Sequence, residues 1–323
     1  MIIAGGVAGS AALAGPLNKA WVAADAKWVV HVDVEAAMGS TIGKCVVEHQ
    51  SELNLEPLNQ FNKYTGLDAF KDIKGITLYS QSIEADGGVV VVVGTAKIEE
   101  SVNRLAAQDK TMHKVEMDGR VVYRWSENKV EKFGCLRTTG EGERMLIVCG
   151  TQPELDSALA VVEGKVETAA KVAEGSLSAT PRGGSMVFVA VRGLDEGGTR
   201  TKGPKILRTA REFNADIGED SEGLYGDMKL KAATAKDAKT TADYLQGMLA
   251  VGKMMVGGDP ETKQLSELMD SVSFAANESE LSAKFRVKHE QLTALVEEVK
   301  AERMKGPAVV PVSDKKAPET PKK

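Results

Sequence analysis

The chain has 323 residues, of which 42% are hydrophobic and 27% charged, and its formal net charge is −5. This hydrophobic content excludes a wholly disordered chain, and the length suffices for one large domain or two ordinary ones. The acidic balance is atypical of general nucleic-acid binders, which are usually basic, so we expect no specific nucleic-acid partner. Because only 5% of the residues are aromatic, we expect a core of Val, Leu, Ile, Ala and Met.

The first 24 residues have the pattern of an export leader. Residues 2–17 carry no charge, and the stretch is too short and too rich in Gly for a membrane span. Small residues typical of cleavage sites stand at 12–14 (Ala-Leu-Ala) and at 22–24 (Val-Ala-Ala). No Lys or Arg precedes Lys19, and a start codon assigned too far downstream would explain this. We expect a periplasmic or secreted protein whose mature chain begins near Asp25 and has no transmembrane helix. An Ala/Gly leader on a cytoplasmic protein is the alternative.

Next along the chain, a unit of a strand followed by a helix recurs. Residues 89–93 (five Val) and 146–149 each run into a Gly-Thr pair, and apolar residues at helical spacing follow. A Thr hydroxyl at this position can accept from free backbone N–H groups of the helix, and residues 151–154 match a capping box. Looser copies begin at residues 228 and 281. Five consecutive Val residues predict a strand that helices cover on both faces.

These repeats predict an α+β fold of two related lobes, each a mostly antiparallel sheet covered by helices. The two opening strands, at 28–34 and 186–192, alternate in the same way, and Asp118-Gly119 predicts a tight hairpin turn. We expect residues 240–256 to form a helix that covers the second lobe. The expected divisions are a leader (1–24), a first lobe (25–170), a linker (171–184), a second lobe (185–304) and a disordered Pro/Lys tail (305–323).

Two stretches resemble a group of exported bacterial proteins known only as uncharacterised. They are residues 28–35 (Trp-Val-Val-His-Val-Asp-Val-Glu) and residues 66–79 (Gly-Leu-Asp-Ala-Phe-Lys-Asp-Ile-Lys-Gly-Ile-Thr-Leu-Tyr). They cover little of the chain, and neither is a catalytic signature. The resemblance implies export and a duplicated α+β fold, and it transfers no mechanism and no site.

His31, Asp33 and Glu35 form the most suggestive set of polar residues. Strand side chains alternate, so the three would share one face of the first strand. An imidazole with two carboxylates is a ligand set for a divalent metal or a set for acid/base chemistry. The alternative is a polar strand face, with Glu35 in the first turn of the next helix, where an acid offsets the helix dipole.

The three cysteines allow one disulfide. A three-residue loop at residues 141–143 would place Cys135 directly opposite Cys149 in a hairpin, within disulfide range in an oxidising compartment. A register change of one residue would point the two side chains apart, leaving two small buried hydrophobic residues. Cys45 is then left over, with no partner His or Asp evident in the sequence.

One local basic run interrupts the acidic background. Lys205, Arg208 and, less closely, Arg211 could line one helix face after Pro204, which would suit phosphate or another anion. The alternative is a solvated helix face balanced by the acidic residues that follow.

Common cofactor and hydrolase motifs are missing from the sequence. Residues 39–45 are one residue short of a phosphate-binding loop, and Thr293 stands where a zinc-protease helix beginning at His289 needs its second His. We therefore expect a non-catalytic binding or envelope-associated structural protein with no cofactor and with an envelope or protein partner. One alternative is a metal-dependent hydrolase built on the possible metal site. Another is a carrier of an apolar ligand held between sheet and helix, suggested by Met248, Leu249, Met254 and Met255.

Overall fold

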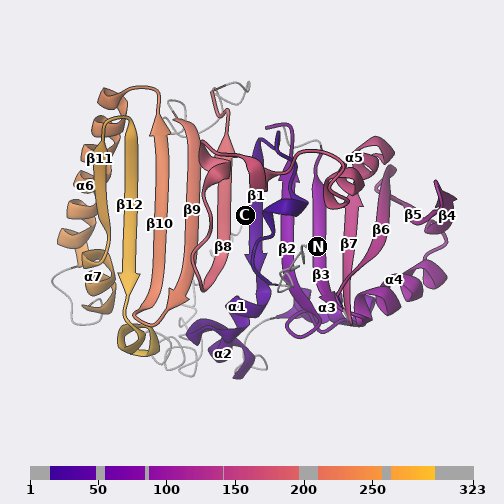
Figure 1. Cartoon of the computed structure of the whole chain (residues 1–323). Helices are drawn as coiled ribbons and strands as arrows, with labels where there is room; N and C mark the ends of the chain where they lie inside the picture. The colour runs from indigo at the N-terminus through magenta and orange to yellow at the C-terminus, as the bar shows by residue number, and fades with distance from the viewer. Residues whose placement is uncertain are drawn as a thin grey trace, which may run out of the picture.

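The computed structural model describes residues 15–48, 55–83, 87–140, 142–195, 210–256 and 263–294, and the fold is α+β. Within these residues twelve strands form one antiparallel sheet, in the order β11-β12-β10-β9-β8-β1-β2-β3-β7-β6-β5-β4 (Figure 1). The strands are β1 (Trp28–Asp33), β2 (Ile73–Ser80), β3 (Val89–Thr95), β4 (His113–Met117), β5 (Arg120–Glu127), β6 (Val130–Gly140), β7 (Glu143–Cys149), β8 (Ser185–Arg192), β9 (Ala210–Asp220), β10 (Gly223–Ala232), β11 (Ser273–Asn277) and β12 (Glu280–Val287).

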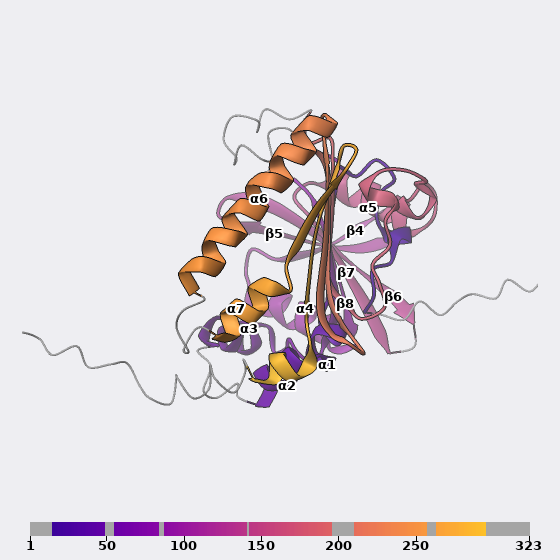
Figure 2. The same ribbon diagram turned by 90° about the vertical axis from the view of Figure 1, so that its left-hand side faces the viewer.

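Helices lie on both sides of this sheet. Figure 2 shows α5 on one side and α6 with α7 on the other. The helices are α1 (Val34–Gly39), α2 (Thr41–Glu48), α3 (Glu56–Thr65), α4 (Lys97–Gln108), α5 (Gln152–Val162), α6 (Ala235–Val256) and α7 (Lys263–Asp270), with short 3-10 helices η1 (Lys19–Trp21), η2 (Ala169–Lys171) and η3 (Ser176–Ser178). Among the described helices, none combines the length and the apolar character needed to cross a bilayer.

The two halves of the chain repeat one connectivity. In the first half, strands β1, β2 and β3 are followed by α4 and by a meander whose last strand, β7, pairs with β3. In the second half, β8, β9 and β10 are followed by α6 and by a shorter meander whose last strand, β12, pairs with β10. This is the topology that a duplication predicts. The halves do not form separate sheets, because β1 pairs with β8 at the centre.

Local signals in the sequence set several element ends as expected. The Thr151 hydroxyl accepts from Glu154 N, and the Glu154 carboxylate accepts from Thr151 N, so the predicted capping box is confirmed. Thr234 caps α6 in the same way by accepting from Asp237 N at 3.1 Å. Thr95 differs, because its hydroxyl donates to Asp72 and leaves α4 without a side-chain cap. The two-residue turn at Asp118 and Gly119 joins β4 to β5 with both φ angles positive, as a primed turn requires.

The side of the sheet that α5 covers, called the α5 face from here on, carries the main hydrophobic core. Val91, Ile147 and Ala190 lie there with exposed fractions of 1% or less. The predicted linker at residues 171–184 also packs on this face. Leu177 is buried in the core, and the Ser176 hydroxyl donates to the Val191 carbonyl at 2.8 Å. Apolar and hydrogen-bonding groups thus bind this segment, which joins the two halves, to the sheet.

The packed chain starts earlier than the predicted boundary at residue 25. Val22 and Ala23 belong to the core of the α5 face, and Leu17 and Trp21 pack against it. Ala23 also forms a bridge with Thr168. Residues 15–24 are thus part of the first half, because they fill the space between the sheet and the segment that follows α5. The predicted tail at 305–323 lies outside the described residues.

Candidate functional site

The middle of the sheet has an apolar surface on the side opposite α5, called the α6 face from here on. Directly paired residues share a face: Val30 pairs with Val189 on β8 and with Leu78 on β2, and Leu78 pairs with Val90 on β3. Along the middle of these four strands, every second residue is apolar and half-buried. We call this set the valine floor: Trp28, Val30, Val32, Ile76, Leu78, Val90, Val187, Val189 and Val191.

Helices border the valine floor on two sides. Beyond β8, α6 packs on β10, β11 and β12 through a cluster that includes Ala238, Ala242 and Leu245. Beyond β3, the cluster of α3 and α4 includes Leu67 and Ile98. On the α5 face the same four strands carry fully buried side chains, so the two faces of one strand segment differ. The prediction that helices cover residues 89–93 on both faces holds only in part on the α6 face, where Val92 packs against the cluster of α3 and α4 but Val90 belongs to the floor.

Helix α6, on the same face of the sheet, also carries exposed apolar side chains. Tyr244, Met248, Val251 and Met255 follow helical spacing, with exposed fractions of 64%, 55%, 54% and 84%. Met254 is 79% exposed. The predicted carrier held Met248, Leu249, Met254 and Met255 between sheet and helix, but among these only Leu249 is half-buried. The three methionines are exposed because alanines and Leu245 occupy the side of α6 that contacts the sheet.

His31 is buried, and both of its ring nitrogens have partners. Nε2 donates to the Gly15 carbonyl at 2.8 Å, because a carbonyl oxygen can only accept, and Nδ1 then accepts from the Thr77 hydroxyl at 2.9 Å. Burial lowers the pKa of His31, and the hydrogen bond to Gly15 opposes this. Burial therefore favours the neutral imidazole, and both of its ring nitrogens are already engaged in hydrogen bonds.

Asp33 and Glu35 lie beside His31 but have other roles. The Asp33 carboxylate accepts from Ala36 N at 2.8 Å and caps α1, and Glu35 lies in the first turn of that helix. Burial raises the pKa of Asp33. Across the described parts of the chain, no group of three His, Cys, Asp or Glu side chains is arranged to hold a metal ion. The three predicted ligands thus converge on the Gly15 backbone instead of an open coordination position.

The cysteines are free thiols in the structure. Pairing of β6 with β7 places Cys135 opposite Ile147 and Cys149 opposite Phe133, two residues from the predicted register. The expected direct pairing is wrong because the irregularity between Thr138 and Gly140 shifts the register near the turn. Both thiols are buried, and burial raises the pKa of Cys149 to about 12.

The predicted anion-binding residues are described only in part. Lys205 and Arg208 lie outside the described residues. Arg211 belongs to β9 and not to a helix, and its guanidinium lies 3.5 Å from the Asp195 carboxylate. The helix face that the sequence suggested therefore does not include Arg211.

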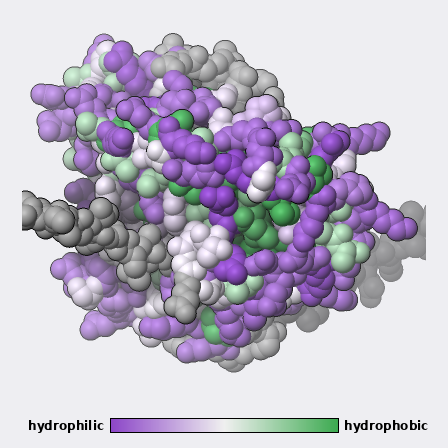
Figure 3. All heavy atoms as spheres, turned by 45° about the vertical axis from the view of Figure 1, so that its right-hand side comes forward, coloured by the Kyte–Doolittle hydropathy of each residue, from purple (hydrophilic) through white to green (hydrophobic). Residues whose placement is uncertain are grey.

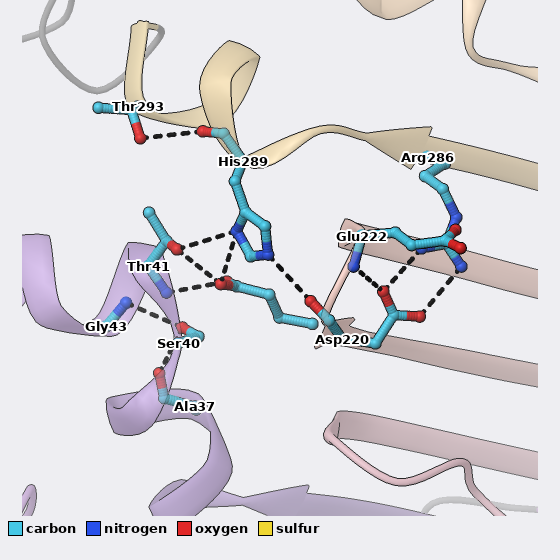
Figure 4. Close-up of polar contacts among 10 residues, drawn as sticks. Ala37, Ser40, Thr41, Gly43, Asp220, Glu222, Arg286, His289 and Thr293 are labelled. Atoms are coloured by element: carbon cyan, nitrogen blue, oxygen red, sulfur yellow. Dashed lines mark hydrogen bonds and ion pairs between the residues drawn. The ribbon is translucent and has the colours of Figure 1, made fainter.

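A cluster that the sequence did not suggest joins the two halves near α2 (Figure 4). Glu219 accepts from the backbone N–H of Thr41 at 2.8 Å and from its hydroxyl at 2.6 Å. His289 donates through Nε2 to the Asp220 carbonyl at 3.0 Å. Arg286 forms two hydrogen bonds with the Asp220 carboxylate and holds its pKa at about 2. The Thr41 hydroxyl donates its proton to the Glu219 carboxylate, and these contacts together hold α2 against the ends of β9 and β12.

On the α5 face of the second half lies a polar hollow of about 640 Å³. Charged side chains of neighbouring strands line it, and they pair with each other, as in Lys229 with Glu280 at 3.2 Å and Lys231 with Glu212 at 3.6 Å. Paired charges of this kind are typical of a solvated sheet face. Figure 3 views the molecule obliquely from this same side, turned toward the first half, and shows apolar residues gathered in a patch near the middle with hydrophilic residues around it; the valine floor faces away in this view.

Comparison with known proteins yields a structural likeness without a family. The chain matches no family model and no curated protein sequence. Among solved structures it is similar to crystal forms I and III of TP0453, with TM-scores of 0.44 and 0.45 and 8% sequence identity. Each alignment covers 88% of this chain and 98% of the other.

Proposed function

We propose that this is an exported, non-catalytic binding protein that holds an apolar ligand, of the lipid acyl-chain type, on the valine floor. The observation that carries the proposal is the contrast between the two faces of the central strands. Val91, Phe188 and Ala190 on the α5 face are fully buried, whereas Val90, Val187 and Val189 on the α6 face are only half-buried.

The physical argument rests on the clustering of these side chains. Single exposed apolar residues are ordinary, but contiguous apolar surface favours a binding site for a partner or an apolar ligand. The floor contains no charged side chain. When a ligand covers its apolar surface, the transfer of that surface from water is favourable by about 25 cal/mol for each Å² buried. On the same face of the sheet, α6 carries exposed methionines, and Met packs adaptably against ligands of irregular shape.

Export is supported by the sequence. Residues 2–17 are uncharged and rich in small apolar residues, and small residues typical of cleavage sites overlap or follow them. The resemblance of residues 28–35 and 66–79 to exported proteins points the same way. A lipid-binding role fits a protein that works in or near an envelope.

The test is ligand binding by the intact protein and by floor variants. We expect native mass spectrometry of gently purified protein to detect co-purified lipid, and we expect the delipidated protein to bind a fluorescent fatty acid. Val189→Asp places a charge at the middle of the floor and should weaken binding by tenfold or more. Val121→Asp is the matched control, because Val121 is 52% exposed on β5, away from the floor.

Stability must be measured on the same samples. If the Val189→Asp protein unfolds, Val189→Ser serves in its place as a milder change. It should still weaken binding measurably. The proposal fails if wild-type protein binds no fatty acid, or if the variants at positions 121 and 189 lose binding equally.

A further inference from the structure

The segment before the second predicted cleavage site is built into the fold. Val22 and Ala23 are 1% and 4% exposed. The backbone N–H of Ala169 donates to the Val22 carbonyl at 2.8 Å, and the Arg192 guanidinium donates to the Ala24 carbonyl at 2.8 Å. A mature chain that began at Asp25 would lose two core side chains and these hydrogen bonds. Processing after Ala24 is therefore at odds with the structure.

The first predicted cleavage site precedes Gly15, and polar side chains surround this residue. Gly15 is buried, and its carbonyl accepts the His31 hydrogen bond. A Cβ atom added to Gly15 would lie 3.1 Å from Glu35 Oε2 and 3.3 Å from Asp33 Oδ1. Two carboxylates thus flank the Gly15 Cα.

These carboxylates have no directly bonded cation among the described residues: Lys74 acts electrostatically on Glu35, but its ammonium group is bonded to the Glu143 carboxylate at 2.7 Å. In the part of the chain that the structure describes, neither Asp33 nor Glu35 forms an ion pair with a Lys, Arg or His side chain. Burial lowers the pKa of His31 next to them and so favours its neutral form. Burial raises the pKa of Asp33, which is the effect of holding a carboxylate away from water without a compensating charge.

We propose that a signal peptidase removes the leader by hydrolysing the peptide bond between Ala14 and Gly15. Water adds across the C–N bond, leaving a carboxylate on Ala14 and an α-amine on Gly15 that is largely protonated at neutral pH. Small residues at positions 12 and 14 suit this cut. The new ammonium group lies one bond from the Cα that Asp33 and Glu35 flank, so it supplies a cation that can pair with them directly. The proposal rests on the proposed export.

The first test identifies the N-terminal residue of the protein that its own host produces from its own gene. Mass spectrometry of the intact chain and of its N-terminal peptide should give Gly15 as the first residue. A first residue of Asp25 in exported protein would overturn the processing site and leave export standing. A chain found in the cytoplasm with residues 1–14 attached would overturn both. Ligand binding on the valine floor is measured separately.

The second test isolates the α-ammonium group. Two purified chains are compared, one beginning at Gly15 and one that keeps Leu13 and Ala14 in front of it. We expect the thermal midpoint of the first chain to be higher by about 2 °C or more. Its α-ammonium group lies on Gly15, close to the two carboxylates, whereas in the longer chain the α-ammonium group lies on Leu13. Substituting Asp33→Asn together with Glu35→Gln should abolish the difference.

Glu48→Gln serves as the matched control, because Glu48 is an exposed carboxylate on α2, and it should leave the difference unchanged. Equal midpoints for the two wild-type chains would contradict the proposed role of the ammonium group. A difference that survives the double substitution at positions 33 and 35 would contradict it as well.

Discussion

At the scale of single residues, buried ionisable side chains link the stability of the fold to pH, and His31 is one of them. Burial lowers the pKa of His31 below its usual value of 6.5. The unfolded chain therefore takes up the proton more readily than the folded chain. The contribution of His31 to the free energy of unfolding is complete above about pH 6.5, and it falls as the pH drops from there toward the folded-state pKa.

This predicts a measurable pH dependence. We expect the free energy of unfolding from urea titrations to fall as the pH drops below about 6.5, and we expect His31→Gln to reduce that slope. The variant should also be less stable by about 1–2 kcal/mol, because the hydrogen bonds to Gly15 and Thr77 are disturbed. Asp33 acts in the opposite direction because its pKa is raised. Its contribution to the free energy of unfolding falls as the pH rises from about 3.8 toward the folded-state pKa. An unchanged slope in the His31 variant would contradict this account.

The polar set at residues 31–35 also shows what residue patterns leave undecided. Alternation alone predicted that His31 and Asp33 share a strand face, and the structure confirms this. The sequence did not indicate their partners, because Gly15 and Thr77 come from distant positions in the chain. A ligand set and a hydrogen-bonded set look alike until those partners are known.

At the scale of elements, helix ends were the most predictable feature. Thr151, Pro153 and Glu154 form a local pattern that satisfies free N–H groups at the start of α5 with no help from distant residues. Tertiary context changed the equivalent start of α4, because Asp72 takes the Thr95 hydroxyl. Helix α6 was predicted from residue 240 and begins at Ala235.

The capping box gives a prediction at this scale. Thr151→Ala should lower the free energy of unfolding by about 1 kcal/mol, because the Glu154 N–H then lacks its side-chain acceptor. Thr151→Ser keeps the hydroxyl and should remain close to wild type. Urea unfolding of the three proteins measures both effects, and equal losses for Ala and Ser would show that the hydroxyl has no capping role.

At the scale of the whole molecule, the two halves share one sheet. Val29 of β1 and Phe188 and Ala190 of β8 belong to the same core cluster, and the Arg192 guanidinium donates to the Ala26 carbonyl at 2.7 Å. Unfolding one half would expose the central strand of the other. The sharing of this core indicates that the halves depend on each other for stability.

We therefore expect the halves to unfold together. Hydrogen exchange followed by mass spectrometry over a urea series should show β2 and β10 losing protection at the same midpoint. Two separate midpoints would mean that the halves behave as independent domains despite the pairing of β1 with β8.

The sequence by itself determined the α+β class, the repeated connectivity and several turns and caps, because these depend on the alternation of residues and on contacts between close neighbours. Only the tertiary structure decided that β1 and β8 pair to make one sheet, that residues 15–24 and 171–184 fill its α5 face, and that the valine floor is half-buried. These features depend on which distant segments meet. A residue pattern sets which side chains share a face, but not what covers that face.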